Sequence, residues 1–594
     1  MFKPAVSDDA PARVNAKEMH PLPSDASASS LPLPQLQPGQ PKGSAFWLCF
    51  LAMVVCNILS ALDVTAVSTI LPTVTHDLGG DNDFVWVGAA YGLASTAALP
   101  FCGRLADVFG RRPVMLMAVA FFFVGSALCG SAKSMNILIL GRTIQGIGGG
   151  AINTMFSIIL SDLVPLVERG VFQGLVVIAW AFAAAIGPVI GGSLAEDASW
   201  RWLFYINLPL AGIAFALVAV FLRVRTPGGT FREKLARLDW SGNFLIITGT
   251  TLALIALTWG GITYPWSSAH VLAPLIIGGA FIVAFLLYEA YIPREPTVPT
   301  DILRNRTSLG GYIADFVHGI VSISVIYYLP VYFQACKLSS PKASGVRFLP
   351  LAVFTSVSAI VCGVVVKKSN MYRPMNYLGW VLTIVGFGLL STLKADSDKG
   401  MWVGYQIVEA IGIGLNWVAV VFPILAPLPV TRVAPAMAFY NFLRTFAQTW
   451  GVTISATILQ NELKRKLPQE FLQELSGGIE IAFAVIPALP TLPEPLRTEV
   501  RVAFAESLAT IWKVLAGISA AGFLAVMLMR EVPMPTFTDD QFGLREDAQG
   551  TDAGAQLEKG TGPAAEEPEP EKGAGVDTLA VGTVSASGSR SALL

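Results

Sequence analysis

The stretch GRLADVFGRRP, residues 103–113, joins two long apolar runs and carries the most specific pattern in the sequence. A glycine at position 110 suits a tight turn between two helices. An aspartate beside such a turn can bind an arginine or the positive end of a neighbouring helix. The arginines can pair with acidic residues of a facing helix bundle, which would hold one face of the protein closed until it opens. The spacing argues against membrane anchoring alone, and we predict a gating role for Gly103, Arg104, Asp107, Gly110, Arg111 and Arg112.

The composition predicts a membrane protein. Hydrophobic residues make up 53% of the 594 and charged residues 14%, whereas soluble domains carry about 25% charged residues. The chain therefore lacks the charge to cover a water-facing surface. Its net charge of −1 does not suggest a nucleic-acid partner. The six cysteines and four histidines form no metal-ligand or nucleophile pattern, so we expect no cofactor, no bound metal and no enzyme activity.

Apolar runs long enough to cross a bilayer fill most of the chain. A helix needs about 20 apolar residues for this, and fourteen such runs predict an all-α membrane protein with fourteen transmembrane helices. Residues 1–44 and 532–594 are polar and are predicted to be disordered cytoplasmic tails. The candidate spans are 46–71, 84–103, 113–131, 135–160, 170–193, 202–222, 240–259, 269–290, 308–333, 345–366, 374–393, 401–425, 434–460 and 508–530.

The loop charges support this count. If both tails are cytoplasmic, the inner loops hold more than twice as many lysines and arginines as the short outer loops, as the positive-inside rule requires. The long outer loop 461–507 also carries positive charge, but long loops translocate largely regardless of charge. We therefore expect both ends of the chain on the inner side.

Two distant stretches indicate an internal repeat. The run GRTIQGIGGG, residues 141–150, is similar to YQIVEAIGIG, residues 405–414, and a Gly-to-Arg-Pro loop follows both the second and the tenth candidate span. Duplicated halves are common in secondary transporters. The repeat therefore predicts two six-helix bundles, at 45–222 and 301–531, joined by a linker with two extra spans at 223–300.

Charged side chains inside the candidate spans are the first candidates for function, because charges in hydrocarbon are costly and face a cavity or a partner. Asp63, Arg142 and Glu409 lie at the same predicted depth below the outer boundary. Equal depth permits an ion pair, and we favour Asp63 with Arg142. A carboxylate that alternates between an arginine and a proton can couple proton movement to transport. We assign proton coupling to these three residues, with a static structural pair as the alternative.

Polar and aromatic residues within the spans suggest a cavity for an amphipathic or aromatic solute. Arg444 lies far from both ends of its candidate span, and polar residues lie about one helical turn away from it. Asp315 and His318 share one helix face, but for them an interfacial role and a coupling role both stay open. The predicted cavity residues are Asn57, Gln145, Trp180, Tyr327, Asn416, Trp417, Tyr440, Asn441 and Arg444. A proline and glycines suited to a kink and close packing lie together at Gly187, Pro188, Gly191 and Gly192.

These motifs resemble the major facilitator superfamily, and in particular its fourteen-span drug:proton antiporter branch of fungal type. GRLADVFGRR resembles the superfamily's loop motif, and LGRTIQGIGGG resembles its fourth-span motif, whose arginine, here Arg142, is implicated in proton coupling. AIGPVIGG resembles the fifth-span motif associated with antiporters. LDVTAVSTILP, residues 62–72, resembles the first-span motif of this branch, with Asp63 at its acidic position. The resemblance covers residues 44–532. The second half departs from the pattern, because its loop GVVVKKSNMYRP contains no aspartate.

The resemblance implies alternating access by two six-helix bundles and export of drugs, toxins or secondary metabolites in exchange for protons. A proton-coupled importer of siderophore or nutrient type is the alternative, because relatives of that kind share the loop motif. A receptor or a polytopic enzyme is less well supported, since the tails are short and no catalytic cluster is found. We expect a small-molecule substrate, protons and the lipid bilayer as partners, a monomer, and the plasma membrane as location, with the vacuolar membrane as the alternative.

Overall fold

The computed structural model describes residues 43–78, 84–224, 228, 230–261, 264–293, 297–298, 301–468, 471 and 486–535. The chain divides into a unit of residues 1–544 and a second unit of residues 545–594, and all described residues belong to the first. Regular structure in these ranges is helical, and Gly260 and Tyr264 form an isolated bridge. The predicted tails 1–44 and 532–594 lie almost entirely outside the described residues.

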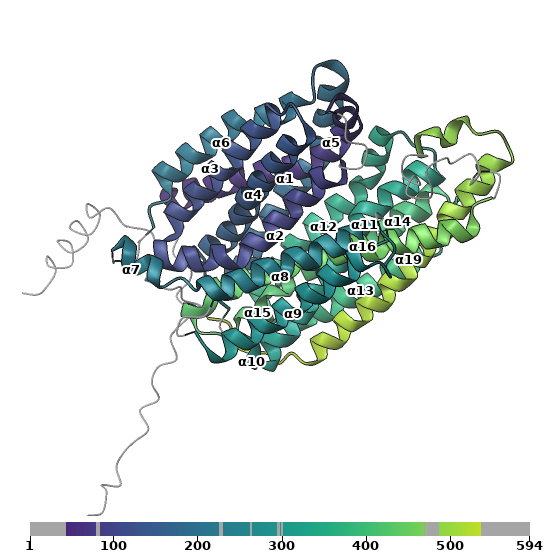
Figure 1. Cartoon of the computed structure of the whole chain (residues 1–594). Helices are drawn as coiled ribbons and strands as arrows, with labels where there is room; N and C mark the ends of the chain where they lie inside the picture. The colour runs from purple at the N-terminus through teal and green to yellow at the C-terminus, as the bar shows by residue number, and fades with distance from the viewer. Residues whose placement is uncertain are drawn as a thin grey trace, which may run out of the picture. The chain divides into compact units, whose positions relative to one another are not determined.

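The helices follow the predicted order of the spans (Figure 1). The helices of the first half are α1 (Ser44–Leu78), α2 (Phe84–Phe109), α3 (Arg111–Gly130), α4 (Met135–Leu163), α5 (Leu166–Asp197) and α6 (Arg201–Phe221). The linker contains α7 (Phe231–Ala236), α8 (Trp240–Trp259), α9 (Ala269–Tyr291) and α10 (Asp301–Arg304). The second half contains α11 (Arg306–Val331), η1 (Tyr332–Cys336), α12 (Pro341–Ser369), α13 (Arg373–Leu390), α14 (Lys399–Ala419), α15 (Val421–Leu425), η2 (Val430–Arg432), α16 (Val433–Lys466), η4 (Ile486–Thr491) and α19 (Leu496–Met527).

Within the described residues, fourteen helices have 18 or more residues, and each coincides with one predicted span. Ten helical segments are long and apolar enough to cross a membrane, judged by length and composition. The largest difference from the prediction concerns residues 461–507, which we expected to be an outer loop. Helix α16 continues to Lys466 and α19 begins at Leu496. Both helices extend beyond their apolar runs, because the hydrogen bonds of a helix can form outside the hydrocarbon of a membrane as well as within it.

The extension of α19 is fastened to the rest of the second half. Arg501 Nε donates to the carbonyl oxygen of Cys336 at 2.9 Å, and its Nη2 donates to that of Ala395 at 3.3 Å. Arg497 pairs with Glu494 at 2.6 Å just before the helix. The first turns of α19 are rich in polar side chains. A search for apolar runs assigns such residues to a loop, and the predicted start of this helix was therefore too late.

Helices pack on one another both within and between the two halves of the chain. In the first half, α3 packs on α4 and α6, α2 packs on α4, and α1 packs on α5 and α6. In the second half, α13 packs on α14 and α19, α12 on α14, and α11 on α16 and α19. The linker helices α8 and α9 pack on each other, and α8 also packs on α2 and on α16. Figure 1 shows this pair beside α2 and α16.

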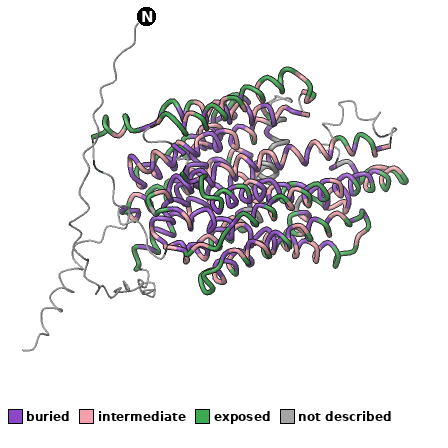
Figure 2. The backbone as a smooth tube through the Cα atoms, turned by 90° about the horizontal axis from the view of Figure 1, so that it is seen from below, coloured by how far each residue is buried: buried purple, intermediate pink, exposed green. Residues whose placement is uncertain are grey.

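Buried and exposed residues follow the pattern of a protein in lipid. Figure 2 shows buried backbone in the interior of the helix assembly and exposed stretches along its outer helices. On α9, the large apolar side chains Ile276, Val283 and Leu287 are exposed. A soluble protein rarely exposes so contiguous an apolar surface. The six cysteines are all buried and unpaired, as expected for residues that fill apolar space.

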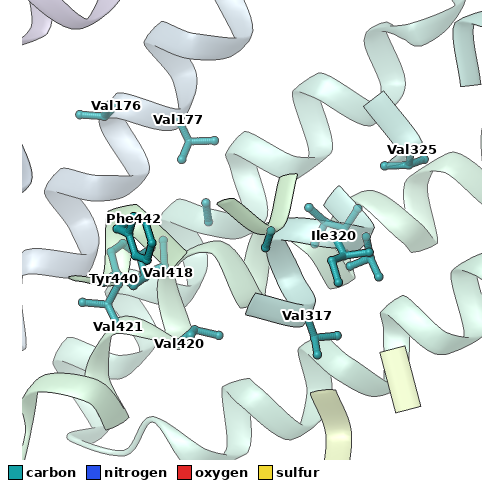
Figure 3. Close-up of a cluster of buried hydrophobic side chains, with 14 of the residues drawn as sticks. Val176, Val177, Val317, Ile320, Val325, Val418, Val420, Val421, Tyr440 and Phe442 are labelled. Carbon is teal, nitrogen blue, oxygen red and sulfur yellow. The ribbon is translucent and has the colours of Figure 1, made fainter. Parts of the chain in front are cut away.

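The two bundles meet along two seams. In the α5–α12 seam, a Cβ atom added to Gly170 would lie 2.9 Å from Gly363 Cα, and one added to Gly174 would lie 2.8 Å from Ile360 Cα. Lys367 Nζ and Glu168 Oε1 form an ion pair at 3.0 Å across the same seam. In the α2–α16 seam, Gly103 lies directly against Ala438. Figure 3 draws part of the buried apolar cluster, to which α5 contributes Val176 and Val177, α11 contributes Val317 and α14 contributes Val418.

Because the α5–α12 seam has no room for a side chain at Gly363, Gly363→Leu should destabilise the protein. The added atoms would overlap the backbone of Gly170, and overpacking of this kind costs about 1–3 kcal/mol. We expect a lower melting temperature for the purified variant. The matched control is Gly404→Leu, because a Cβ atom at Gly404 meets nothing within 4 Å. Equal melting temperatures for the two variants would show that the seam is not tightly packed.

Candidate functional site

Asp63 lies at the centre of a buried polar network in the first bundle. Its Oδ2 atom pairs with Arg142 Nη1 at 2.5 Å. Its Oδ1 atom accepts hydrogen bonds from Gln145 Nε2 at 2.8 Å and from Asn207 Nδ2 at 3.0 Å. All four residues are buried, with Asp63 0% exposed. The carboxylate on α1 is therefore held by donors from α4 and α6, and a buried charge requires such compensation.

A second layer of contacts orients Arg142. Its Nε atom donates to the carbonyl oxygen of Val87 on α2 at 3.0 Å, and its Nη1 atom also donates to Gln145 Oε1 at 2.6 Å. The guanidinium lies over the ring of Tyr91, 4.5 Å from the ring centroid. Gln145 Nε2 also donates to Ser126 Oγ on α3 at 2.9 Å. The network around the pair thus connects α1, α2, α3, α4 and α6. A change of charge on Asp63 would alter contacts that involve all five helices.

The structure contains the ion pair that equal depth suggested for Asp63 and Arg142. Gln145, which we predicted to line the substrate cavity, instead belongs to this network. Asn207 was missed by the sequence reasoning. It could have been found, because it is an asparagine inside the apolar run of the sixth span, in the stretch WRWLFYINLP at residues 200–209.

The second bundle contains an ion pair that we did not predict. Asp315 Oδ1 on α11 lies 2.7 Å from Arg444 Nη2 and accepts a hydrogen bond from Arg444 Nε at 2.8 Å. Both residues are buried. The Arg444 guanidinium lies between the rings of Tyr440 and Trp417, 4.5 Å and 5.0 Å from their centroids, an arrangement that stabilises a cation. Arg444, Tyr440 and Trp417, predicted as separate cavity residues, thus form one cluster.

His318, one turn after Asp315, faces the same cluster. Its Nε2 atom lies 3.2 Å from the carbonyl oxygen of Ile413, and its ring contacts Trp417 edge-on at 5.4 Å. Among the described residues, His318 Nδ1 and Asp315 Oδ2 are buried without a hydrogen-bond partner. Both side chains are 0% exposed and face the interior of the protein. The interfacial role and the coupling role for Asp315 and His318 both stay predictions.

Glu409 is buried in α14 but lies apart from both pairs. Its carboxyl group packs against the backbone of Gly386 and Phe387 on α13. Neither carboxylate oxygen has a hydrogen-bond partner of good geometry in the part of the chain that the structure describes. The equal depth of Glu409 and Asp63 therefore does not bring the two carboxyls together, because they belong to different bundles.

The remaining predicted cavity residues are distributed over several environments. Asn57 on α1 is buried, and its Nδ2 atom has no partner among the described residues. Trp180 on α5 packs against a small cluster of α1 and α5 residues. Asn441 donates to the carbonyl oxygen of Met437 in its own helix. Asn416 faces α13, where Nδ2 donates to Thr383 Oγ1 at 3.3 Å, and Tyr327 is 54% exposed. The contact of Asn416 with α13 does not match the cavity lining that we predicted, whereas the place of Tyr327 in that lining stays a prediction.

The predicted gating loop forms its ion pairs within the first bundle. Arg111 Nε pairs with Asp162 Oδ2 on α4 at 2.7 Å, and Arg111 Nη1 pairs with Asp107 Oδ1 at 3.0 Å. We had expected these arginines to pair with acidic residues of the other bundle. The C-terminal end of α4 supplies Asp162 close by, so Arg111 is neutralised locally. Contact with the second bundle comes instead from Gly103, which lies against Ala438.

The other loop residues bind backbone carbonyls or shape the turn. Arg112 Nη2 donates to the carbonyl oxygen of Ala219 on α6, and Arg104 Nη2 lies 3.5 Å from that of Arg237 before α8. Gly110 has φ 94°, a conformation that residues with a side chain rarely adopt. This confirms the tight turn predicted at position 110.

Gly187 in α5 brings this helix close to the network around Asp63. A Cβ atom at Gly187 would overlap the side chain of Thr65 on α1, two residues after Asp63. Thr65 Oγ1 also donates to the carbonyl oxygen of Ala183 on α5 at 3.2 Å. Gly191 is buried. Pro188 and Gly192 lie in α5 as predicted, but their side-chain environments are outside the described residues.

Two bundles of long apolar helices, each with a buried arginine–aspartate pair, define a membrane transporter. The chain belongs to the major facilitator superfamily, whose family model matches residues 53–454. The family resemblance stated above is thereby confirmed.

Curated relatives cover almost the whole chain. Efflux pump FUS6 of Gibberella fujikuroi is 39% identical over 542 residues, which cover 90% of this chain and 97% of the relative. MFS-type efflux pump LUC4 of a Fusarium species is 38% identical over 532 residues, covering 88% and 94%. Among solved structures, the human organic anion transporter MFSD10 (TETRAN) matches 82% of this chain and all of its own with a TM-score of 0.52 and 14% identity. The last comparison bears on the fold alone.

Proposed function

We propose that this chain is a proton-coupled antiporter that exports small amphipathic molecules such as drugs, toxins or secondary metabolites. The observation that carries the proposal is the Asp63–Arg142 pair, a buried carboxylate whose donors come from two other helices. If Asp63 binds a proton, its charge is lost, and Arg142 is released to change partner. Protonation then changes contacts among the helices of the first bundle, which is what coupling requires.

The names of the relatives favour export over import. Both FUS6 and LUC4 are called efflux pumps, and this supports the exporter against the siderophore or nutrient importer. The clustered side chains of Tyr440, Trp417 and Arg444 support an amphipathic or aromatic substrate, because they offer flat apolar faces beside a polar group. Asn57, Trp180 and Asn441 complete the proposed cavity lining.

The proposed topology has fourteen spans, with bundles at 45–222 and 301–531 and two extra spans in the linker 223–300. Both tails are cytoplasmic, and the protein works as a monomer in the plasma membrane. The fourteen long helices in the described residues support the count. In this topology the ends of α2 and α4 that carry Asp107, Arg111 and Asp162 face the cytoplasm.

The test is proton movement in reconstituted vesicles that contain a trapped pH-sensitive dye. A panel of amphipathic fluorescent drugs, including ethidium and rhodamine 6G, is added in the presence of an imposed pH gradient. We expect at least one drug to move against protons and to dissipate the gradient, and protein-free vesicles provide the control. Drug flux that ignores the gradient would exclude proton coupling. Drug and protons moving in the same direction would favour the importer.

A further inference from the structure

Two acidic residues of the linker helices lie together in a buried site that the transport proposal does not use. Asp239 precedes α8, and Glu289 lies near the end of α9. They are 9% and 5% exposed. Both carboxyl groups lie over Gly242, since a Cβ atom added there would meet oxygens of both side chains. Two carboxyl groups this close together and shielded from water cannot both be ionised without a compensating positive charge.

One oxygen of each carboxyl group has ordinary donors. Asp239 Oδ1 accepts from the backbone N–H of Gly242 at 2.9 Å and from the Tyr288 hydroxyl at 3.0 Å. Glu289 Oε1 accepts from the backbone N–H of Thr297 at 3.1 Å. The other two oxygens, Asp239 Oδ2 and Glu289 Oε2, are buried without a donor in the described part of the chain. The two side chains are nevertheless within hydrogen-bonding reach of each other.

We propose that Asp239 and Glu289 hold one shared proton and act as a proton-dependent latch that fastens the segment after α9 to the start of α8. Two carboxyl oxygens can form a hydrogen bond only when one of them carries a proton, as in other carboxyl pairs that share a site. When the proton leaves, two like charges remain in a buried site, and the latch opens.

The charged surroundings favour a proton over neutralisation by a basic side chain. Among the titratable and charged groups on the elements around the pair, Tyr288 on α9 contacts Asp239 directly. The others are Arg237 in the turn before α8, and Arg104 and Asp107 on α2. Helix α16 also packs on α8. Its two nearby arginines have acidic partners of their own, since Arg432 pairs with Asp301 and Arg444 pairs with Asp315. Arg237 and Arg104 interact with Asp107 of the gating loop. Hard cations prefer six or more oxygen ligands, but the Tyr288 hydroxyl and Thr297 Oγ1 are already engaged.

The latch joins the start of α8 to the end of α9 and to the segment that follows α9. Asn243, one turn after Asp239, donates to Thr297 Oγ1 at 3.1 Å, and this strengthens the same junction. Two residues before Asp239, the carbonyl oxygen of Arg237 lies 3.5 Å from Arg104 Nη2 in the gating loop. The protonation state of the pair therefore bears on the position of the gating loop, independently of Asp63.

The test measures the melting temperature of the purified full-length protein in detergent from acidic to alkaline pH. In wild type we expect the melting temperature to fall by several degrees on the alkaline side, where the shared proton leaves. Glu289→Gln should remove this alkaline fall, because the glutamine amide donates permanently to Asp239. Glu289→Ala should melt lower at every pH, since it leaves Asp239 and Thr297 without their partner. The control Asp301→Asn, an exposed acid that pairs with Arg432, should keep the wild-type pH profile.

Infrared spectroscopy gives a second readout that does not depend on stability. At neutral pH the wild-type spectrum minus the Glu289→Gln spectrum should contain the carbonyl stretch of a protonated carboxyl group. An alkaline fall that persists in Glu289→Gln, or a difference spectrum without this band, would overturn the proposal. So would a melting temperature that rises with Na⁺, Mg²⁺ or Ca²⁺ in wild type but not in Glu289→Gln, because the pair would then bind a cation.

Discussion

Asp63→Asn is expected to abolish drug export driven by a pH gradient while leaving drug exchange across the vesicle membrane. Asparagine keeps an oxygen that can accept from Gln145 and Asn207, but it cannot bind and release a proton. A carrier that has lost its proton site can still exchange drug molecules on its two sides, because exchange needs no net proton movement. The measurement compares gradient-driven efflux of a transported drug with its one-for-one exchange at equal pH.

Asp63→Asn also leaves Arg142 without its ionic partner, so its folding has to be checked. The matched control is Asp301→Asn, which removes an exposed carboxylate of a surface pair and should transport normally. The double variant Asp63→Asn, Arg142→Gln removes both charges. It should melt closer to wild type than the single variant but remain uncoupled. Gradient-driven efflux by a well-folded Asp63→Asn protein would show that the coupling proton binds elsewhere.

Arg444→Ala should be among the most destabilising single substitutions in the second bundle. It leaves Asp315 ionised or forces it to bind a proton in a fully buried position. Breaking a buried ion pair by removing one partner costs about 3–5 kcal/mol. The rings of Tyr440 and Trp417 would also lose the guanidinium that lies between them. The expected result is a large fall in melting temperature and in the fraction of monodisperse protein on size exclusion.

The double variant Asp315→Asn, Arg444→Gln tests whether the charge pair causes this effect. Replacing both members of a buried pair is often close to neutral, so the double variant should recover most of the lost stability. Arg432→Ala breaks an exposed pair with Asp301 and should change stability by about 1 kcal/mol or less. If the double variant melts as low as Arg444→Ala, the loss comes from packing of the long arginine side chain instead.

The sequence allowed the order of helices and one ion pair to be predicted. Depth along a helix is fixed by its rise per residue, so the pairing of Asp63 with Arg142 could be anticipated. The same reasoning could have found Asp315 with Arg444, because the two residues lie at similar distances from the first residues of α11 and α16. The depth of a residue does not tell which way its side chain points around the helix axis, or which bundle the helix belongs to. Glu409 was therefore grouped with Asp63, although it packs against α13.

Local partners were the hardest feature to predict. The arginines of the loop motif could pair with any nearby acid, and only the packing of α3 on α4 brings Asp162 to Arg111. Gln145 was read as a cavity residue because polar residues in a span can face either a cavity or a neighbouring helix. Because α1, α3 and α4 lie close together, the Gln145 side chain contacts the neighbouring helices. The boundary of α19 was missed because its polar first turns bind the rest of the bundle instead of forming a loop.

Contact of α8 with both α2 and α16 makes the two seams between the bundles unequal. Aromatic pairs reinforce the cover on one side, with Phe101 and Trp240 at 5.9 Å and Trp86 and Trp259 at 6.1 Å. In the described part of the chain, the α5–α12 seam has no such cover. A lipid molecule in the surrounding bilayer can therefore reach the outer side of the α5–α12 seam, whereas α8 stands between the lipid and the α2–α16 seam.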